Sequence, residues 1–331
     1  MSAASAAASS LAAAASAAAA AGPTLSIALV GAGLVGAEFL AQVAALQARA
    51  APAARLRVVA VATEAVAAQY PHFAALGLHV VTPNKKAFSG DPELLARIRA
   101  AAAAAGTLVL HESTVGAGLP ILSTLNDLVD TGDDIVKIEG IFSGTLSFIF
   151  NQFSTPGSAD APAFSSVVQK AKELGYTEPD PRDDLNGLDV ARKVVILARL
   201  AGIPLTLQSL AIENIVPEPL RQVATADEFL ARLPEFDAHF AALHRDARAA
   251  GSVLRYVGTV GPRPDLCGVR LVRFPADHPF ASLKGSDNII AFTTRRFPNP
   301  LIVQGAGAGA AVTAFGMLSD ILKIARTLRS G

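Results

Sequence analysis

Short apolar runs alternate with longer helical stretches in the first part of the chain. Contiguous apolar residues predict buried strands at 25–30, 56–62, 78–82 and 107–110. Segments rich in alanine and leucine separate these runs and have the length of helices. Strands that alternate with helices are typical of a parallel, doubly wound sheet. We therefore predict an α/β fold of the Rossmann type for this part.

The pattern changes after residue 121. Alternating apolar and polar positions predict strands of a separate sheet at 135–142, 254–258, 268–273, 289–294 and 301–304. Apolar residues with helical spacing predict helices at 145–153, 164–174, 187–201 and 237–250. This part is predicted to be an α+β domain, and a last helix is expected at about 310–328.

A glycine-rich turn follows the first predicted strand. Its glycines have the G-x-G-x-x-G spacing, and an alanine-rich helical segment comes next. Glycine permits the tight turn, lets the backbone approach a pyrophosphate and allows close packing of helix on strand. A phosphate would lie at the helix N-terminus, where free N–H groups favour negative charge. The turn predicts dinucleotide binding by Gly31, Gly33, Leu34, Val35 and Gly36, and the alternative is an ordinary glycine-rich turn.

Carboxylates crowd around two prolines just ahead of an apolar helix, in the segment 175–193. Asn186 or Asp184 can cap this helix, because their side chains accept hydrogen bonds from its free N–H groups. Asp189 and Lys193 are four residues apart and project from one helical face. A lysine where a helix enters a core, one turn after a carboxylate, is a candidate proton-transfer group. The alternative is an acidic loop with a surface ion pair.

The amino-acid sequence of this segment resembles the catalytic signature of homoserine dehydrogenases, most closely that of the single-function fungal type. Other segments match the same family in the same order, at 82–88, 111–120, 139–145, 278–288 and 304–309. The resemblance implies an NAD- or NADP-dependent oxidoreductase that interconverts L-aspartate 4-semialdehyde and L-homoserine, a reaction of threonine and methionine biosynthesis. It also implies a Rossmann-like domain followed by an α+β substrate and dimerisation domain.

The resemblance also assigns the catalytic roles. Lys193 becomes the acid–base candidate, with Asp184 in support. Lys86 is the second lysine, and it is predicted to polarise the substrate carbonyl or to meet a cofactor phosphate. It follows a predicted strand, at the carboxyl edge where open α/β sheets bind ligands. The alternative for Lys86 is a solvated surface lysine.

Substrate and cofactor contacts follow from the same family. An amino-acid substrate carries an ammonium group, which Glu178 and Asp189 are expected to bind, while Thr145 is expected to donate to the substrate. The alternative is a salt-bridged loop. Gly175 and Gly309 are expected to let the backbone close on the cofactor, and the alternative is loop flexibility.

A structural sodium ion is implied by the family at a glycine-broken turn. Backbone carbonyls with one carboxylate form a hard-oxygen site of the kind that suits an alkali ion. The residues that the resemblance assigns to this ion are Glu112, Val115, Ala117 and Leu119.

The expected organisation has three parts. Residues 1–22, almost pure alanine and serine, are predicted to be a disordered low-complexity tail. Residues 23–118, completed by 305–331, are assigned to the NAD(P)-binding domain, and 119–304 to the catalytic and dimerisation domain. The stretch between the second and third predicted strands is shorter than in the family. We therefore expect a shortened nucleotide-binding domain.

Composition narrows the class of partner. The chain has 28 Lys+Arg and 28 Asp+Glu, so its net charge is zero and it has no overall bias toward nucleic acid. Its one cysteine, Cys267, excludes a disulfide framework and favours a reducing, cytoplasmic location. No segment predicts a membrane span, no Cys/His spacing indicates zinc, and the family implies a homodimer. The alternative function is a cofactor-deficient homologue or splice product that acts as a non-catalytic interaction partner.

Overall fold

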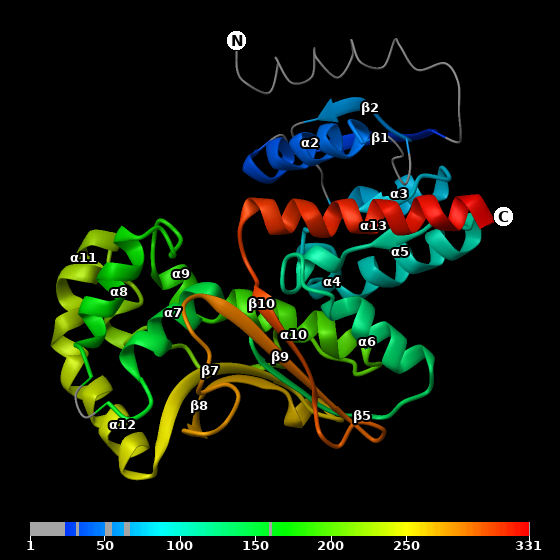
Figure 1. The fold of residues 1–331 in the computed structure, drawn as a ribbon. Coiled ribbons are helices and arrows are strands. Elements are labelled where there is room, and N and C mark those ends of the chain that lie inside the picture. The colour runs from blue at the N-terminus through cyan, green and yellow to red at the C-terminus, as the bar shows by residue number, and fades with distance from the viewer. Residues whose placement is uncertain (1–23, 31–32, 50–54, 63–66, 159–160, 331) are drawn as a thin grey trace. The chain divides into compact units, whose positions relative to one another are not determined.

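A computed structural model of the chain describes residues 24–30, 33–49, 55–62, 67–158 and 161–330 (Figure 1). The chain forms two compact units. The first comprises Met1–Ala87, Asp91–Gly118 and Ala308–Gly331, and the second comprises Phe88–Gly90 and Leu119–Gly307.

Parallel strand pairs form the sheet structure of the first unit. Its strands are β1 (Thr24–Val30), β2 (Arg55–Ala62), β3 (Val80–Val81) and β4 (Val109–Leu110). β1 pairs with β2 and β3 pairs with β4, both in parallel. The predicted parallel α/β class is therefore confirmed, although within the described residues the strands form two separate pairs. The strands predicted at 78–82 and 107–110 are only two residues long.

Helices surround these pairs. In chain order they are α2 (Leu34–Gln47), η1 (Ala67–Gln69), α3 (Tyr70–Ala75), α4 (Lys86–Ser89), α5 (Pro92–Ala105), η2 (Glu112–Thr114) and α13 (Ala310–Ser330), and α4 ends in the second unit. α5 begins where Asp91 accepts the N–H of Glu93 and Pro92 occupies the first turn, and ends at Gly106 with φ 63°. The local sequence therefore accounts for both ends of this helix.

The C-terminal helix α13 completes the core of the first unit. It packs on α2, which follows the glycine turn, and the buried residues they share are Phe39, Leu40, Val43, Ala314, Met317, Ile321 and Ala325. Hydrophobic burial stabilises folded chains by roughly 25 cal/mol per Å² of apolar surface. The two ends of the described chain are thus joined by the hydrophobic effect.

A mixed sheet of six strands forms the second unit, in the order β10-β9-β5-β7-β8-β6. The strands are β5 (Ile135–Ile141), β6 (Ala211–Ile212), β7 (Ser252–Val260), β8 (Gly268–Pro275), β9 (Asp287–Thr294) and β10 (Leu301–Ala306). Neighbouring strands are antiparallel except β6 and β8. The separate sheet predicted from alternation is confirmed, while β6 was not predicted.

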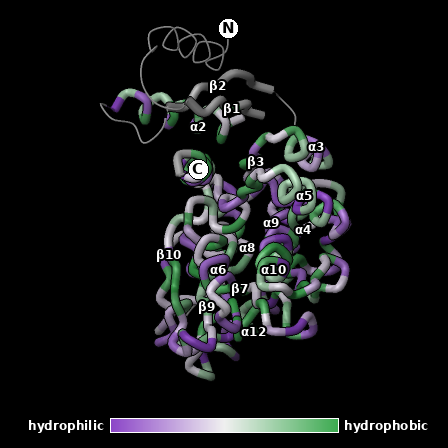
Figure 2. Tube along the Cα trace, turned by 90° about the vertical axis from the view of Figure 1, so that its right-hand side faces the viewer, coloured by the Kyte–Doolittle hydropathy of each residue, from purple (hydrophilic) through white to green (hydrophobic). Residues whose placement is uncertain are grey.

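The helices of the second unit are α6 (Ile121–Asp130), α7 (Gly144–Phe153), α8 (Phe164–Glu173), α9 (Arg182–Leu185), α10 (Leu188–Leu200), η3 (Glu218–Leu220), α11 (Ala226–Arg232), η4 (Leu233–Phe236), α12 (Asp237–Ala249) and η5 (Pro264–Leu266). Hydrophobic residues run along α10 and β10 (Figure 2). An aromatic cluster joins α7, α8 and α12, with Phe164 stacked on Phe240 at 3.8 Å between ring centroids. His244 lies against Phe153 in the same cluster and is only 4% exposed.

Candidate functional site

Helix α10 carries the lysine on which the site is built. Lys193 is 6% exposed, and its Nζ lies 2.9 Å from Oδ2 of Asp189. The same Nζ donates to the backbone carbonyl of Phe142 at 2.6 Å. Phe142 directly follows β5, so a helix and a strand together hold the ammonium. The predicted i, i+4 arrangement of Asp189 and Lys193 is confirmed, with the lysine buried and the carboxylate half-exposed.

The start of α10 is fixed by its own residues. Gly187 precedes the helix with φ 76°, a left-handed conformation that glycine adopts without strain. A Cβ at this position would collide with the hydroxyl of Tyr256. Asn186 Oδ1 accepts the N–H of Leu188 at 2.8 Å. Of the two predicted caps, Asn186 therefore satisfies a free N–H of the helix and Asp184 does not.

Asp184 organises the acidic loop ahead of α10. Its Oδ2 accepts the backbone N–H of Glu178 at 2.8 Å, and its Oδ1 lies 2.9 Å from the hydroxyl of Thr145. Burial raises the pKa of Asp184, against these hydrogen bonds, and the carboxylates of Glu178 and Asp189 raise it further. Within the described residues these bonds go to the loop and to α7, and none goes to Lys193.

Thr145 stands in the first turn of α7. Its hydroxyl donates toward the carbonyl of Tyr176 at 2.5 Å as well as toward Asp184. A threonine hydroxyl has one hydrogen, so these two acceptors share it. Thr145 therefore joins the loop to α7, and its single donor is engaged inside the protein.

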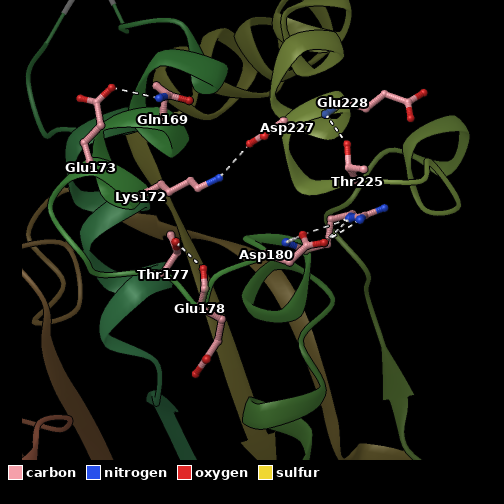
Figure 3. A network of polar contacts seen from close by, with 10 residues as sticks. Gln169, Lys172, Glu173, Thr177, Glu178, Asp180, Thr225, Asp227 and Glu228 are labelled. Carbon is pink, nitrogen blue, oxygen red and sulfur yellow. Dashed lines mark hydrogen bonds and ion pairs between the residues drawn. The ribbon is translucent and has the colours of Figure 1, made fainter.

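The side chain of Glu178 is exposed, while hydrogen bonds hold its backbone in place. The residue is exposed, and its carboxylate points away from the neighbouring ion pairs (Figure 3). The Thr177 hydroxyl donates to the Glu178 carbonyl at 2.8 Å. No hydrogen bond or ion pair involves the Glu178 carboxylate within the described residues. Such a side chain is available to an external cation.

One ion pair lies within the acidic loop, and another joins α8 to α11 beside it (Figure 3). Arg182 donates to both carboxylate oxygens of Asp180, with Nη2 to Oδ2 at 2.6 Å, and its Nη1 donates to the carbonyl of Val223 at 2.7 Å. The guanidinium lowers the pKa of Asp180. Lys172 on α8 pairs with Asp227 on α11 at 3.4 Å. The bidentate Arg182 pair gives the loop a defined geometry.

Lys86 lies in the first unit, shortly after β3. Its backbone N–H donates to Oδ1 of Asn84 at 2.9 Å, and the N–H of Asn84 donates to Oγ1 of Thr82 at 3.1 Å. Tyr70 adds a hydrogen bond to Thr82 at 3.0 Å. The Lys86 side chain is exposed. The connection after β3 is thus fixed by local polar contacts.

The glycine turn leads into α2. Gly31 lies outside the described residues. Gly33 is the exposed N-cap of α2, and within the described residues no side chain caps the N–H groups of this helix. Leu34 is 85% exposed and Gly36 is buried. Val35 packs against the core that α2 and α13 share. The free N–H groups at an exposed helix N-terminus favour the binding of a phosphate group.

Two other glycines assigned to the cofactor have positive φ. Gly309, which directly precedes α13 in the first unit, has φ 118°. Gly175 is exposed in the second unit and has φ 73°. Both conformations require glycine, and neither observation identifies a ligand.

The residues predicted for sodium lie around η2. Glu112 is 6% exposed, and its Oε2 lies 3.2 Å from Nζ of Lys323. Val115 is fully buried, and Ala117 has φ 53°. Leu119 begins the second unit, and its carbonyl accepts the N–H of Ile121 at 2.8 Å. The Glu112 carboxylate therefore already has a cationic partner.

Within the described residues, no three His, Cys, Asp or Glu side chains gather as a metal site would require. The described helices also lack one with the length and apolarity needed to cross a bilayer.

Two family models match the chain. The model for homoserine dehydrogenase matches residues 120–322. The model for the NAD-binding domain of homoserine dehydrogenase matches residues 61–112.

Curated relatives carry the same name. Homoserine dehydrogenase of Schizosaccharomyces pombe is 51% identical over 271 residues, which are 81% of this chain and 72% of the relative. That of Emericella nidulans is 54% identical over 284 residues, which are 84% of this chain and 77% of the relative. The bifunctional aspartokinase/homoserine dehydrogenase 1 of Arabidopsis thaliana is 53% identical over 261 residues, but these are only 28% of the relative.

Solved structures agree in fold. A Candida auris protein of unknown function has a TM-score of 0.85 and 43% identity, with 92% of this chain and 98% of that chain covered. A hyperthermophilic archaeal homoserine dehydrogenase in complex with NADPH has a TM-score of 0.67 and 20% identity, with 92% of this chain and 98% of that chain covered. From the matched models and the extent of identity, the chain belongs to the homoserine dehydrogenase family.

Proposed function

We propose that this chain catalyses the NAD(P)-dependent interconversion of L-homoserine and L-aspartate 4-semialdehyde. The observation that carries the proposal is the buried ammonium of Lys193, held between Asp189 and the Phe142 carbonyl beside an ordered acidic loop. Reduction of an aldehyde requires a proton for the oxygen, and a positioned lysine can supply it.

Lys193 handles the proton. The nicotinamide cofactor, when bound, supplies or accepts the hydride at the substrate carbon. In reduction, the ammonium form of Lys193 gives a proton from Nζ to the developing alkoxide, and in oxidation the neutral amine form takes the hydroxyl proton. Asp189 and the Phe142 carbonyl hold Nζ in place for both directions. Lys86 is the second proposed lysine, acting on the carbonyl oxygen or on a cofactor phosphate.

The acidic loop is proposed to bind the amino-acid end of the substrate. The Glu178 carboxylate is exposed, and the Asp189 carboxylate is half-exposed beside Lys193, so both can pair with an ammonium group. Thr145 and Asp184 support this loop through their mutual hydrogen bond. Thr145 is therefore proposed to act mainly by fixing the loop, because its hydroxyl hydrogen is already shared by two acceptors.

Cofactor binding is assigned to the turn before α2, whose N-terminus lacks a side-chain cap. The choice between NAD and NADP depends on residues after β2, where residues 63–66 lie outside the described ones. Gly175 and Gly309 remain proposed cofactor contacts. A non-catalytic role is not favoured by any observation, since the relatives of the chain are dehydrogenases by name.

Sodium at Glu112, Val115, Ala117 and Leu119 stays a proposal. Of the proposed sodium ligands, the Glu112 carboxylate fits poorly, because it already pairs with Lys323. Backbone carbonyls are the donors that would suit the ion. Atomic absorption on protein dialysed against sodium-free buffer tests whether an ion is retained.

A homodimer is proposed to form through the sheet of the second unit. Val136 on β5 and Ile302 on β10 are 49% and 39% exposed, and Phe297 between β9 and β10 is 41% exposed. Large apolar side chains exposed on a sheet are typical of association surfaces. Sedimentation equilibrium measures the oligomeric state directly.

The reaction is tested with the purified chain. L-homoserine is added with NAD⁺ or NADP⁺, and the absorbance of the reduced cofactor is followed. Formation of L-aspartate 4-semialdehyde, trapped as a hydrazone, supports the proposal. Absence of product with either cofactor, although calorimetry shows that the cofactor is bound, contradicts it.

A further inference from the structure

A buried asparagine shares the backbone acceptor of Lys193. Asn288 lies on β9 and is 0% exposed. Its Nδ2 donates to the carbonyl of Phe142 at 3.1 Å, and Lys193 Nζ donates to the same oxygen at 2.6 Å. A carbonyl oxygen has two lone pairs, so it can serve both donors. The two side chains thus converge on one atom from a strand and a helix.

The oxygen of the Asn288 amide lies in a different environment from its nitrogen. Within the described residues, Oδ1 of Asn288 has no hydrogen-bond partner although it is buried. A buried acceptor that loses its bonds to water costs free energy. Turning the amide over would place that oxygen against the Phe142 carbonyl, where two acceptors would repel. The useful contact of this asparagine is therefore its N–H bond to Phe142.

A glycine closes over the same amide. A Cβ at Gly307 would collide with Nδ2 and Cγ of Asn288. The backbone after β10 therefore limits the positions open to this side chain. A larger residue at position 307 would therefore displace the Asn288 amide without changing the amide itself.

We propose that Asn288 is a positioning residue for Lys193. By holding the Phe142 carbonyl, it fixes the acceptor that, together with Asp189, sets the place of the ammonium. The inference rests on the proposed function, because the ammonium matters only if Lys193 moves the proton. Displacement of a catalytic group by about 1 Å costs roughly 100-fold in rate.

Substitution at both positions tests the role. Asn288→Ala removes the N–H donor, and Gly307→Ala pushes the amide away while leaving it intact. We expect kcat for homoserine oxidation to fall roughly 10- to 100-fold in each variant, with little change in KM for the cofactor. If Asn288→Ala does not fold, Gly307→Ala decides the question.

Asn151 provides the matched control. It is also a buried asparagine whose Oδ1 has no partner in the described part of the chain, and its Nδ2 donates to the Gly285 carbonyl at 3.0 Å. Asn151→Ala should lower the melting temperature and leave kcat close to wild type. An equal loss of kcat in the control variant would mean that both asparagines act only through the fold, and would overturn the proposal.

Asn288→Asp supplies a pH-dependent readout. A protonated carboxyl can donate to the Phe142 carbonyl and a carboxylate cannot. Burial raises the pKa of the new carboxyl, while the Lys193 ammonium lowers it. Asp189 faces the same lysine, and Asp287 precedes the position on β9, but both are also present in wild type. Relative to wild type, kcat of the variant should therefore fall as pH rises through the new pKa.

The outcomes separate the two claims. Asn151→Asp should show no such fall in kcat, and circular dichroism at each pH confirms that both variants stay folded. Folded Asn288 and Gly307 variants with wild-type kcat and wild-type pH profile would overturn the positioning role alone. A wild-type chain that binds cofactor but never oxidises homoserine would overturn the proposed function, and this inference with it.

Discussion

Lys193 has two acceptors that come from different elements of the second unit. Asp189 precedes it on α10, and the Phe142 carbonyl follows β5. A charged side chain this deeply buried is stable only with such partners. The side chain is therefore held before any substrate arrives, as proton transfer at a defined oxygen requires.

Lys193→Ala should lower kcat by roughly 10²- to 10⁴-fold, because a positioned acid–base group contributes about that much. Cofactor affinity should hardly change. The control is Lys172→Ala, which removes a lysine of an ion pair on α8. Steady-state kinetics and cofactor titration measure both quantities. A Lys193→Ala variant that keeps more than a small fraction of wild-type turnover would exclude the role.

Glu178→Ala should raise KM for L-homoserine. Glu178 is exposed, so loss of its charge pair with the substrate costs up to about 1 kcal/mol, equivalent to about 5-fold in binding. The matched control is Glu173→Ala, an exposed glutamate on α8 that accepts from Gln169. Initial-rate measurements with each substrate varied in turn distinguish the roles. Unchanged KM for homoserine with weakened cofactor binding would reverse the assignment.

His244 makes the stability of the second unit sensitive to acid. Burial lowers the pKa of His244, and the positive charge of Arg248 lowers it further. The unfolded chain then binds the proton more readily than the folded one, so stability is lost as pH falls below about 6.5. His244→Phe should flatten this dependence, measured as urea midpoints across the pH range. An unchanged slope would show that other groups cause the acid sensitivity.

Single residues were predictable where local spacing decides their position. The Asp189–Lys193 pair follows from helical geometry and was confirmed. Asn186, one of the two residues predicted to cap α10, accepts the N–H of Leu188, although Gly187 is the N-cap residue. The role of Asn288 was not predictable, because its partner Phe142, which directly follows β5, is far away in the sequence. Asp184 was predicted as a cap but makes tertiary bonds instead. Contacts between residues that are far apart in the sequence leave no periodic pattern in it.

At the scale of elements, the start of α10 sets where the face that carries Asp189 and Lys193 begins. Gly187 allows the chain to turn into the helix, and the Tyr256 hydroxyl closes against it while donating to the Glu213 carbonyl at 2.6 Å. This contact also joins α10 to β7. The register of Asp189 and Lys193 depends on this junction.

Gly187→Ala should destabilise the fold by more than positive φ alone, which costs roughly 1–3 kcal/mol. The control is Gly202→Ala at the other end of α10, where φ is 80° but nothing lies within 4 Å of a new Cβ. The difference between the two variants in free energy of unfolding isolates the collision with Tyr256. Equal losses in chemical denaturation would show that the hydroxyl simply moves aside.

Most long elements were predicted, while the two-residue strand β6 was not. Helices α7, α8, α10 and α12 begin and end within a residue or two of their predicted bounds because apolar periodicity was clear. β6 has only two residues and depends on pairing with β8, so no local pattern could indicate it. The strands predicted at 78–82 and 107–110 are only two residues long in the structure, because they too depend on pairing with each other.

At the scale of the whole molecule, the length of the nucleotide-binding part is expected to influence cofactor affinity. The chain spans 72% of the Schizosaccharomyces pombe relative, and the NAD-binding family model matches only from residue 61. The turn before α2 can still receive a phosphate. If the section after β2 is shortened, as the sequence predicts, we expect fewer contacts to the adenosine part of the cofactor.

NAD(P) binding by this chain should therefore be weaker than binding by the Schizosaccharomyces pombe relative. Isothermal titration of both proteins under identical conditions measures the difference. Insertion of the relative's section after Ala62 should recover affinity, while an insertion of scrambled sequence should not. Equal affinities of the two natural proteins would show that the shorter section is sufficient.

Helix α13 leaves the ribosome long after its partner α2, because more than 250 residues separate the two helices. Until Ala314, Met317 and Ile321 emerge, Phe39 and Val43 lack the surface that buries them in the finished unit. The second unit has all of its elements by Gly307 and can fold earlier during synthesis. Premature termination shortly before Ala310 would leave nascent chains with a complete sheet unit and an exposed apolar α2, a substrate for chaperones and proteases.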